Sequence, residues 1–210
     1  MDRLTTYFPE LSAHQHRQFE QLEELFRQWN ARINMVSRRD VEHLEVRHIL
    51  HSLAIAKFIR FVPGAVVMDL GTGGGFPGLP LAIYFPETNF VLVDSRGKKI
   101  MAVEAMVRAL QLANVRTIHG RAEDIPGLKC DFVISRAVAR MDKLFRWSRR
   151  HLALQPQRHA YPNGIIALKG GDLTEEMQQV PGKPYWEEVA IRQYFPEPDF
   201  EGKKVVYLQI

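Results

Sequence analysis

The chain has 210 residues, of which 46% are hydrophobic and 25% are charged, a composition typical of one globular α/β domain with a short appendage. Its single cysteine, Cys130, excludes an intrachain disulfide and a cysteine-based zinc site, and we expect no bound metal. Residues 1–17 lack the apolar core of a signal peptide, and no apolar run approaches the roughly 18 residues that cross a bilayer. These features predict a soluble, cytoplasmic protein with no membrane partner.

The net charge of +4 is unevenly distributed along the chain. Residues 136–171 contain 8 Lys or Arg and a single Asp, whereas residues 172–210 contain 4 Lys or Arg and 8 Asp or Glu. A local basic segment beside a balanced body indicates a polyanionic partner. A solvated helix face leaves the same pattern, so the charge alone does not decide between the two.

The first 62 residues have helical patterns. Ser12 and Gln15 form a capping-box motif, and apolar residues then recur at three- and four-residue spacings from Phe19 to Ile33. Asp40 is expected to cap a second helix, before the Pro63-Gly64 pair interrupts the chain. We therefore expect a helical appendage at 1–62, packed on a domain at 63–210.

From residue 65 the pattern alternates between strand and helix. The expected strands are 66–69, 90–94, 115–119, 132–135, 164–168, 187–194 and 205–210, and the expected helices are 79–85, 98–112, 141–152 and 172–180. Strands separated by helices imply an α/β fold with a mostly parallel sheet covered on both faces. The last two strands have no helix between them, which predicts an antiparallel hairpin at the edge of the sheet.

The turn after the first strand has five glycines in the eight positions 71–78. Glycines there let the backbone turn sharply and approach a ligand, with a helix N-terminus facing it. Asp69, which ends the strand, disfavours a pyrophosphate and suits a cationic ligand such as S-adenosylmethionine. Asp94 ends the next strand, where a carboxylate can accept hydrogen bonds from ribose hydroxyls. The pattern therefore favours S-adenosylmethionine over a nicotinamide cofactor.

The same segment resembles a known family, the bacterial 16S rRNA guanine-N7 methyltransferases, also called the glucose-inhibited division protein B family. The resemblance rests on the continuation of the glycine turn through Phe76-Pro77-Gly78, and on matching motifs in chain order. These motifs are Asn34-Met35-Val36, Arg47-His48, Ser52-Leu53, Val93-Asp94-Ser95, Ile134-Ser135-Arg136-Ala137 and Leu168-Lys169-Gly170. The chain departs from the family at His51, where an Asp is common, and at 155–163, which looks like a local insertion.

The resemblance implies a Rossmann-like class I methyltransferase fold, S-adenosylmethionine as cofactor, and 16S rRNA or the small ribosomal subunit as partner. It also implies methylation of a guanine N7, a nitrogen with a free lone pair that needs no general base. Catalysis is then positional, and we name no catalytic acid or base. The cofactor residues carried over from the family are Gly71, Gly73, Phe76, Asp94, Ser95, Arg96, Ala122, Glu123 and Arg136. His48 is expected to be a core residue, and we expect a monomer.

Six basic residues are expected to contact RNA. They are Arg140, Lys143, Arg146, Arg149, Arg150 and Lys169. Several of them fall on one face of the helix expected after the fourth strand, where three- and four-residue spacings align side chains. That helix begins at the carboxyl edge of the sheet, where ligands of doubly wound folds bind.

Other functions are compatible with parts of this pattern. A small-molecule or protein methyltransferase would keep the glycine turn but would give the basic segment no purpose. A non-catalytic RNA-binding domain would not need the intact Asp69, glycine turn and Asp94. Some residues also have purely structural interpretations: a solvated turn at Glu123, and a salt bridge at Arg136.

Overall fold

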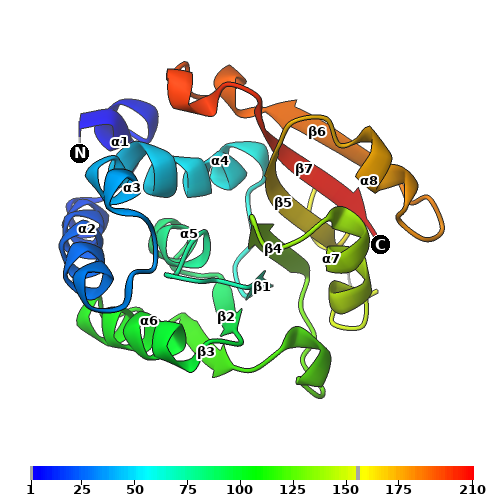
Figure 1. The fold of residues 1–210 in the computed structure, drawn as a ribbon, viewed down its shortest axis with the longest axis horizontal. Helices are drawn as coiled ribbons and strands as arrows, with labels where there is room; N and C mark the ends of the chain where they lie inside the picture. Colours follow the sequence, from blue (N-terminus) through cyan, green and yellow to red (C-terminus); the bar gives the residue numbers. More distant parts are fainter. Residues whose placement is uncertain (1, 155–156) are drawn as a thin grey trace.

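The computed structural model describes residues 2–154 and 157–210, so the first two residues of the expected insertion at 155–163 lie outside the described part. A seven-stranded sheet with the order β3-β2-β1-β4-β5-β7-β6 runs through the molecule (Figure 1). The strands are β1 (Val66–Leu70), β2 (Asn89–Asp94), β3 (Val115–His119), β4 (Phe132–Arg136), β5 (Gly164–Gly170), β6 (Trp186–Ala190) and β7 (Lys203–Gln209). β1 to β5 are mutually parallel, whereas β7 pairs antiparallel with both β5 and β6. The predicted α/β fold with an antiparallel C-terminal edge hairpin is confirmed.

Helices cover both faces of the sheet. They are α1 (Asp2–Tyr7), α2 (Ala13–Ile33), α3 (Arg38–Glu42), η1 (Glu45–Leu50), α4 (His51–Phe58), α5 (Gly78–Tyr84), α6 (Gly97–Ala109), η2 (Ala122–Asp124), α7 (Met141–Ser148), α8 (Thr174–Gln178), η3 (Ile191–Gln193) and η4 (Pro198–Phe200). Side chains alternate along each strand, so Phe90 and Leu92 join the core beneath α2, α4, α5 and α6. Val91 and Val93 point the other way, into the core beneath α7 and α8.

The N-terminal helices share the first of these cores with the sheet. The capping box forms as expected, because the Ser12 Oγ accepts from the backbone N–H of Gln15. Phe19, Leu22 and Phe26 of α2 are completely buried. The second helix begins differently from the expectation, because Ser37 is its N-cap and accepts from the backbone N–H of Asp40. The division of the chain at residue 62 stays a prediction.

Four predicted elements are longer than the observed ones. α6 ends at Ala109, although the helix was expected to run to residue 112. α7 ends at Ser148, and the chain continues as an extended bridge between Leu152 and Cys130. α8 is confined to 174–178. β6 ends at Ala190 because the chain turns there and buries Ile191 completely. In each case an apolar pattern continued past the point where tertiary packing redirects the backbone.

Candidate functional site

The glycine turn between β1 and α5 has little room for side chains. Gly71 has a φ of +72°, and a Cβ there would lie 2.5 Å from the Cγ2 of Val138. At Gly78 a Cβ would lie 2.0 Å from the Cδ2 of Leu92, which is a steric overlap. The first glycine is needed for its backbone conformation and the second for the close packing of α5 on β2. Together they keep the turn close to the carboxyl end of the sheet.

Two strand-terminal carboxylates hold this turn in place. The Asp69 Oδ2 accepts from the Gly78 N–H at 2.9 Å. The Asp94 Oδ2 accepts from the Gly73 N–H at 2.9 Å, and its Oδ1 accepts from the Arg96 N–H at 2.8 Å. Asp94 therefore joins the glycine turn to the start of α6. Each carboxylate oxygen keeps a further lone pair, which leaves Asp94 able to accept from a bound ligand.

Asp69 lies behind the turn and is completely buried. Burial raises the pKa of Asp69 to about 7, although hydrogen bonds from the Thr72 side chain and the Gly78 N–H oppose that shift. A positive charge bound nearby would favour the ionised carboxylate, so the structure fits a cationic ligand. Asp69 itself does not line the cavity described next.

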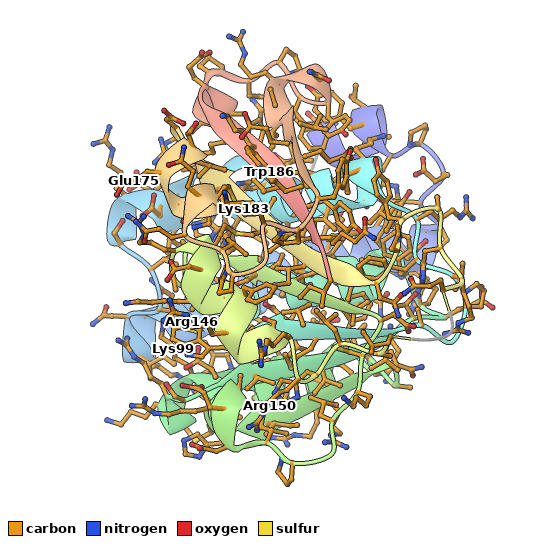
Figure 2. The ribbon with its side chains drawn as sticks, turned by 90° about the vertical axis from the view of Figure 1, so that its right-hand side faces the viewer. Lys99, Arg146, Arg150, Glu175, Lys183 and Trp186 are labelled. Atoms are coloured by element: carbon orange, nitrogen blue, oxygen red, sulfur yellow. The ribbon has the colours of Figure 1, made fainter. Side chains whose placement is uncertain are left out.

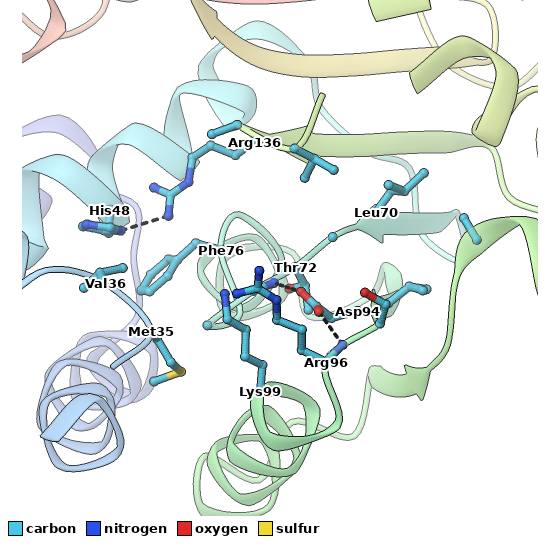
Figure 3. Close-up of a pocket in the computed structure, with 18 of the residues that line it drawn as sticks. Met35, Val36, His48, Leu70, Thr72, Phe76, Asp94, Arg96, Lys99 and Arg136 are labelled. Atoms are coloured by element: carbon cyan, nitrogen blue, oxygen red, sulfur yellow. Dashed lines mark hydrogen bonds between the residues drawn. The ribbon is translucent and has the colours of Figure 1, made fainter. Parts of the chain in front are cut away.

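A cavity of about 740 Å³ opens at the carboxyl ends of β1, β2 and β4 (Figure 3). It is lined by every residue that the sequence assigned to the cofactor: Gly71, Gly73, Phe76, Asp94, Ser95, Arg96, Ala122, Glu123 and Arg136. The structure thus gathers in one place residues that are up to 65 positions apart in the chain. This position at the end of parallel strands is where doubly wound folds bind their ligands.

Arg136, His48 and Phe76 form a cluster in this cavity, and Figure 3 shows the three side chains together. The Arg136 Nη2 lies 2.9 Å from the His48 Nδ1, and the guanidinium carbon is 5.2 Å from the centre of the Phe76 ring. Burial and the nearby Arg136 charge lower the pKa of His48 to about 3. His48 is therefore neutral and accepts the hydrogen bond from Arg136. The sequence predicted a core histidine; its ring is buried as expected, but it also lines the cavity.

Comparisons with known proteins match the chain along almost its whole length. Residues 15–194 match the family model described as rRNA small subunit methyltransferase G. The chain belongs to this family. Relatives named "Ribosomal RNA small subunit methyltransferase G" are 50% identical in Porphyromonas gingivalis, over 97% of this chain and 91% of theirs, and 49% identical in Bacteroides thetaiotaomicron, over 100% of both chains. A solved SAM-dependent methyltransferase from Aquifex aeolicus has the same fold, with a TM-score of 0.53 and 16% identity over 76% of this chain and 89% of that one.

In this member of the rRNA small subunit methyltransferase G family, further residues that the sequence did not select line the cavity. They are Met35, Val36, Asp40, Arg47, His51, Lys99, Arg121 and Lys203, among others. The motifs Asn34-Met35-Val36 and Arg47-His48 had signalled part of this set, but only as a resemblance without a role. Lys203 lies at the start of β7, and neither motif nor spacing in the sequence pointed to it.

The basic residues assigned to RNA lie outside this cavity, and several are held by other groups. Lys169, 12% exposed, donates to the Ala139 carbonyl at 2.7 Å and pairs with Glu176 at 3.0 Å. Arg140 and Arg146 both approach the buried Asp142, at 3.8 and 3.5 Å. Lys143 and Arg149 are exposed on the surface of the same segment. The assignment of Lys169 to RNA stays a prediction, but its ammonium group is already bound by Glu176 and the Ala139 carbonyl.

Arg150 is exposed but also contacts the loop that follows β3. In Figure 2 it lies against this loop, apart from Arg146. Its Nη2 donates to the carbonyls of Ala122 at 3.4 Å and Ile125 at 3.1 Å. Next to it, the two ring nitrogens of His151 lie 2.8 Å from the Ala122 carbonyl and 3.1 Å from the Leu128 carbonyl. Arg150 and His151 thus hold the loop that brings Ala122 and Glu123 to the cavity.

The remaining chemistry of the described residues is limited. No group of three or more His, Cys, Asp or Glu in residues 2–154 and 157–210 is arranged to hold a metal ion. None of the helices in that part of the chain is long and apolar enough to span a membrane. Burial raises the pKa of the Cys130 thiol to about 12, and Cys130 does not line the cavity. Cys130 is consequently a structural residue rather than a nucleophile.

Proposed function

We propose that this protein transfers a methyl group from S-adenosylmethionine to N7 of a guanine in small-subunit rRNA. The observation that carries the proposal is the cavity at the carboxyl edge of the sheet. Its lining unites the glycine turn, Asp94 and Arg136 in a chain that belongs to the rRNA small subunit methyltransferase G family. An enzyme that acts on the ribosomal small subunit or its rRNA works in the cytoplasm, where we place it.

The residues of the cavity fit the cofactor in charge and shape. Asp94 would accept from the ribose hydroxyls, and Ser95 and Arg96 would border them, because all three line the cavity at the end of β2. Ala122 and Glu123 would border the adenine from the loop held by Arg150 and His151. Gly71, Gly73 and Phe76 would flank the methionine end. The buried Asp69 lies behind this turn and holds the Gly78 N–H, and a cation bound in front of the turn would favour its ionised form.

S-adenosylmethionine supplies an electrophilic methyl group on a positively charged sulfur. Guanine N7 has a lone pair at neutral pH, so the protein need not remove a proton before the transfer. The task of this chain is to position the two reacting atoms in line and to keep water out. The cluster of Arg136, His48 and Phe76 suits that task, because the guanidinium is fixed on two sides by a neutral imidazole and an aromatic ring.

The RNA backbone would meet the cations around the cavity and the exposed basic residues near it. Arg96 and Arg121 are exposed and line the cavity, and Lys99 lines it from α6. Lys143 and Arg149 are exposed on the segment of α7 and remain part of the proposal, together with Arg140 and Arg146. Contacts of this kind to phosphates would orient the RNA while a guanine enters the cavity from a loop or by flipping out of its stack.

The test is methyl transfer by the purified protein. It would be incubated with labelled S-adenosylmethionine and either small ribosomal subunits or naked small-subunit rRNA, and the nucleosides would be analysed by mass spectrometry. We expect labelled 7-methylguanosine at one position in at least one of the two substrates. Binding of S-adenosylmethionine by calorimetry, without any labelled 7-methylguanosine from either substrate, would contradict the proposal and point to a small-molecule or protein substrate.

A further inference from the structure

The cavity extends beyond the residues that would hold the cofactor. Figure 3 shows Met35, Val36 and His48 on one side of Phe76, and Thr72 and Asp94 on the other. The far side is lined by the segment that leads from α2 to α4 and by the start of β7. We call this part the acceptor pocket, and its residues are Met35, Val36, Asp40, Arg47, His48 and Lys203. Phe76 and Arg136 form its border with the cofactor side.

Arg136 has hydrogen-bond donors available at this border. Of its five N–H groups, one on Nη2 faces the His48 Nδ1 at 2.9 Å and one on Nη1 faces the Arg47 carbonyl at 3.3 Å. Within the described residues no carboxylate forms an ion pair with it. Burial lowers the pKa of Arg136 to about 10, which leaves the guanidinium charged at neutral pH. A buried cation in this state is stabilised by an acceptor oxygen on a ligand.

Asp40 supplies hydrogen-bond acceptors in the acceptor pocket, whereas Arg136 supplies donors. Its Oδ2 accepts from the Ser37 hydroxyl at 2.6 Å, and its Oδ1 is 3.4 Å from the Arg47 Nη1. The Ser37 hydroxyl and Arg47 lower the pKa of Asp40, so the carboxylate is ionised and can only accept. The other cavity-lining carboxylates in the described chain, Asp94 and Glu123, lie on the cofactor side. Asp40 is therefore the anionic acceptor that faces the acceptor pocket.

This arrangement of one carboxylate and one guanidinium around apolar walls selects among the RNA bases. Guanine presents two adjacent donors, N1–H and the N2 amino group, and its O6 acceptor lies next to N7. Adenine has an acceptor at N1, which a carboxylate repels, and uracil has one donor in place of two. We infer that the acceptor pocket binds the target guanine, with Asp40 accepting from N1–H and the N2 amino group and Arg136 donating to O6. The inference rests on the proposed function and deepens it.

The same contacts favour the reaction itself. The N7 lone pair forms the bond to the methyl carbon, the electrons of the broken carbon–sulfur bond remain on sulfur, and no proton moves. The guanine ring gains the positive charge that the sulfonium loses. N1–H and the N2 amino group become stronger donors as that charge develops. The hydrogen bonds to Asp40 therefore strengthen toward the transition state, which is the condition for an interaction to increase the rate.

The contact is tested by removing the N2 amino group from the RNA and the Asp40 carboxylate from the protein. The methylated guanine would first be located with the wild-type protein, and a synthetic RNA would then carry inosine there, which lacks only the N2 amino group. We expect the wild type to methylate guanine about 10- to 100-fold more efficiently than inosine, as for a hydrogen bond to a charged group. In Asp40→Ala this ratio should fall to near one, with the affinity for S-adenosylmethionine unchanged.

Glu42→Ala is the matched control, because Glu42 is an exposed carboxylate on the same helix α3 and does not line the cavity. It should keep the wild-type ratio. Arg47 retains Asp199 at 2.7 Å in Asp40→Ala, so the fold has a second anchor there. If Asp40→Ala nevertheless loses cofactor binding, Asp40→Asn decides, and its ratio should also fall below that of the wild type.

Equal losses on both RNAs in the Asp40 variants, or equal rates on both RNAs for the wild type, would overturn the contact to the N2 amino group while the proposed function stands. The absence of guanine methylation by the wild type would overturn both proposals together.

Discussion

Arg150 tests whether a residue of the basic segment supports the cofactor site or contacts RNA. Its side chain donates to the Ala122 and Ile125 carbonyls. Hydrogen bonds from a charged donor contribute about 1.5–3 kcal/mol each when buried, and less at this partly exposed place, so we expect Arg150→Gln to lose about 1–2 kcal/mol in total. That loss corresponds to a melting temperature lower by several degrees. It would also raise the dissociation constant of S-adenosylmethionine by at most about 5- to 30-fold, because the loop carries Ala122 and Glu123.

The role of Arg150 is tested by comparing Arg150→Gln with Arg149→Gln in three measurements. These are thermal unfolding, calorimetry with S-adenosylmethionine, and RNA binding as a function of salt. Arg149→Gln is the control, since Arg149 is the adjacent arginine and is exposed like Arg150. We expect Arg149→Gln to leave stability and cofactor affinity unchanged. If Arg149 contacts a phosphate, its loss flattens the slope of log affinity against log salt by about 0.7–0.9. The reasoning is refuted if Arg150→Gln flattens that slope and leaves cofactor affinity unchanged, because Arg150 would then contact RNA.

Three further predictions concern the turn and its surroundings. Asp94→Ala removes an acceptor for the Gly73 N–H and for the ribose, so calorimetry should show cofactor affinity about 10- to 100-fold lower; an unchanged affinity would place the ribose elsewhere. Gly78→Ala introduces a Cβ 2.0 Å from Leu92, so denaturant unfolding should show a loss of about 1–3 kcal/mol, and wild-type stability would contradict the packing. The pKa of His48 is about 3 in the folded protein against 6.5 as its ordinary value, so the unfolded chain binds the proton first as the pH falls. The free energy of unfolding should decline by up to about 1.4 kcal/mol per pH unit below pH 6 through this residue, and His48→Gln should show a shallower decline.

The fold and the cofactor side of the cavity could be predicted because their signals are local. A strand, a glycine turn and a helix follow one another between Val66 and Tyr84, and Asp94 ends the adjacent strand. Parallel strands bring their carboxyl ends to one edge, so residues that end the strands or directly follow them meet there without further information. Gly71, Asp94 and Arg136 all have such positions. Their places in the cavity follow from the topology that the alternation of strands and helices predicts.

The acceptor pocket could not be predicted in the same way, because no local sequence pattern predicts how the elements that carry its residues pack together. Asp40 lies on a five-residue helix that Ser37 caps, and it lines the cavity only because α2 and α4 pack against the sheet. Lys203 starts a strand more than 60 residues beyond Arg136, and β7 reaches the cavity because it inserts between β5 and β6. Neither position carries a turn, a cap or a periodicity that points to a ligand.

The basic segment shows a different reason why sequence alone falls short. A count of charges treats each arginine and lysine as a free surface cation, but the folded chain supplies partners from distant positions. Glu176 of α8 takes up Lys169, and the carbonyls that follow β3 take up Arg150. Both cations thus stabilise loops next to the cavity, and Arg150 does so while it stays exposed. The number of basic residues in a segment therefore gives only the maximum number of phosphate contacts. The actual number depends on how many of their N–H donors remain free in the folded protein.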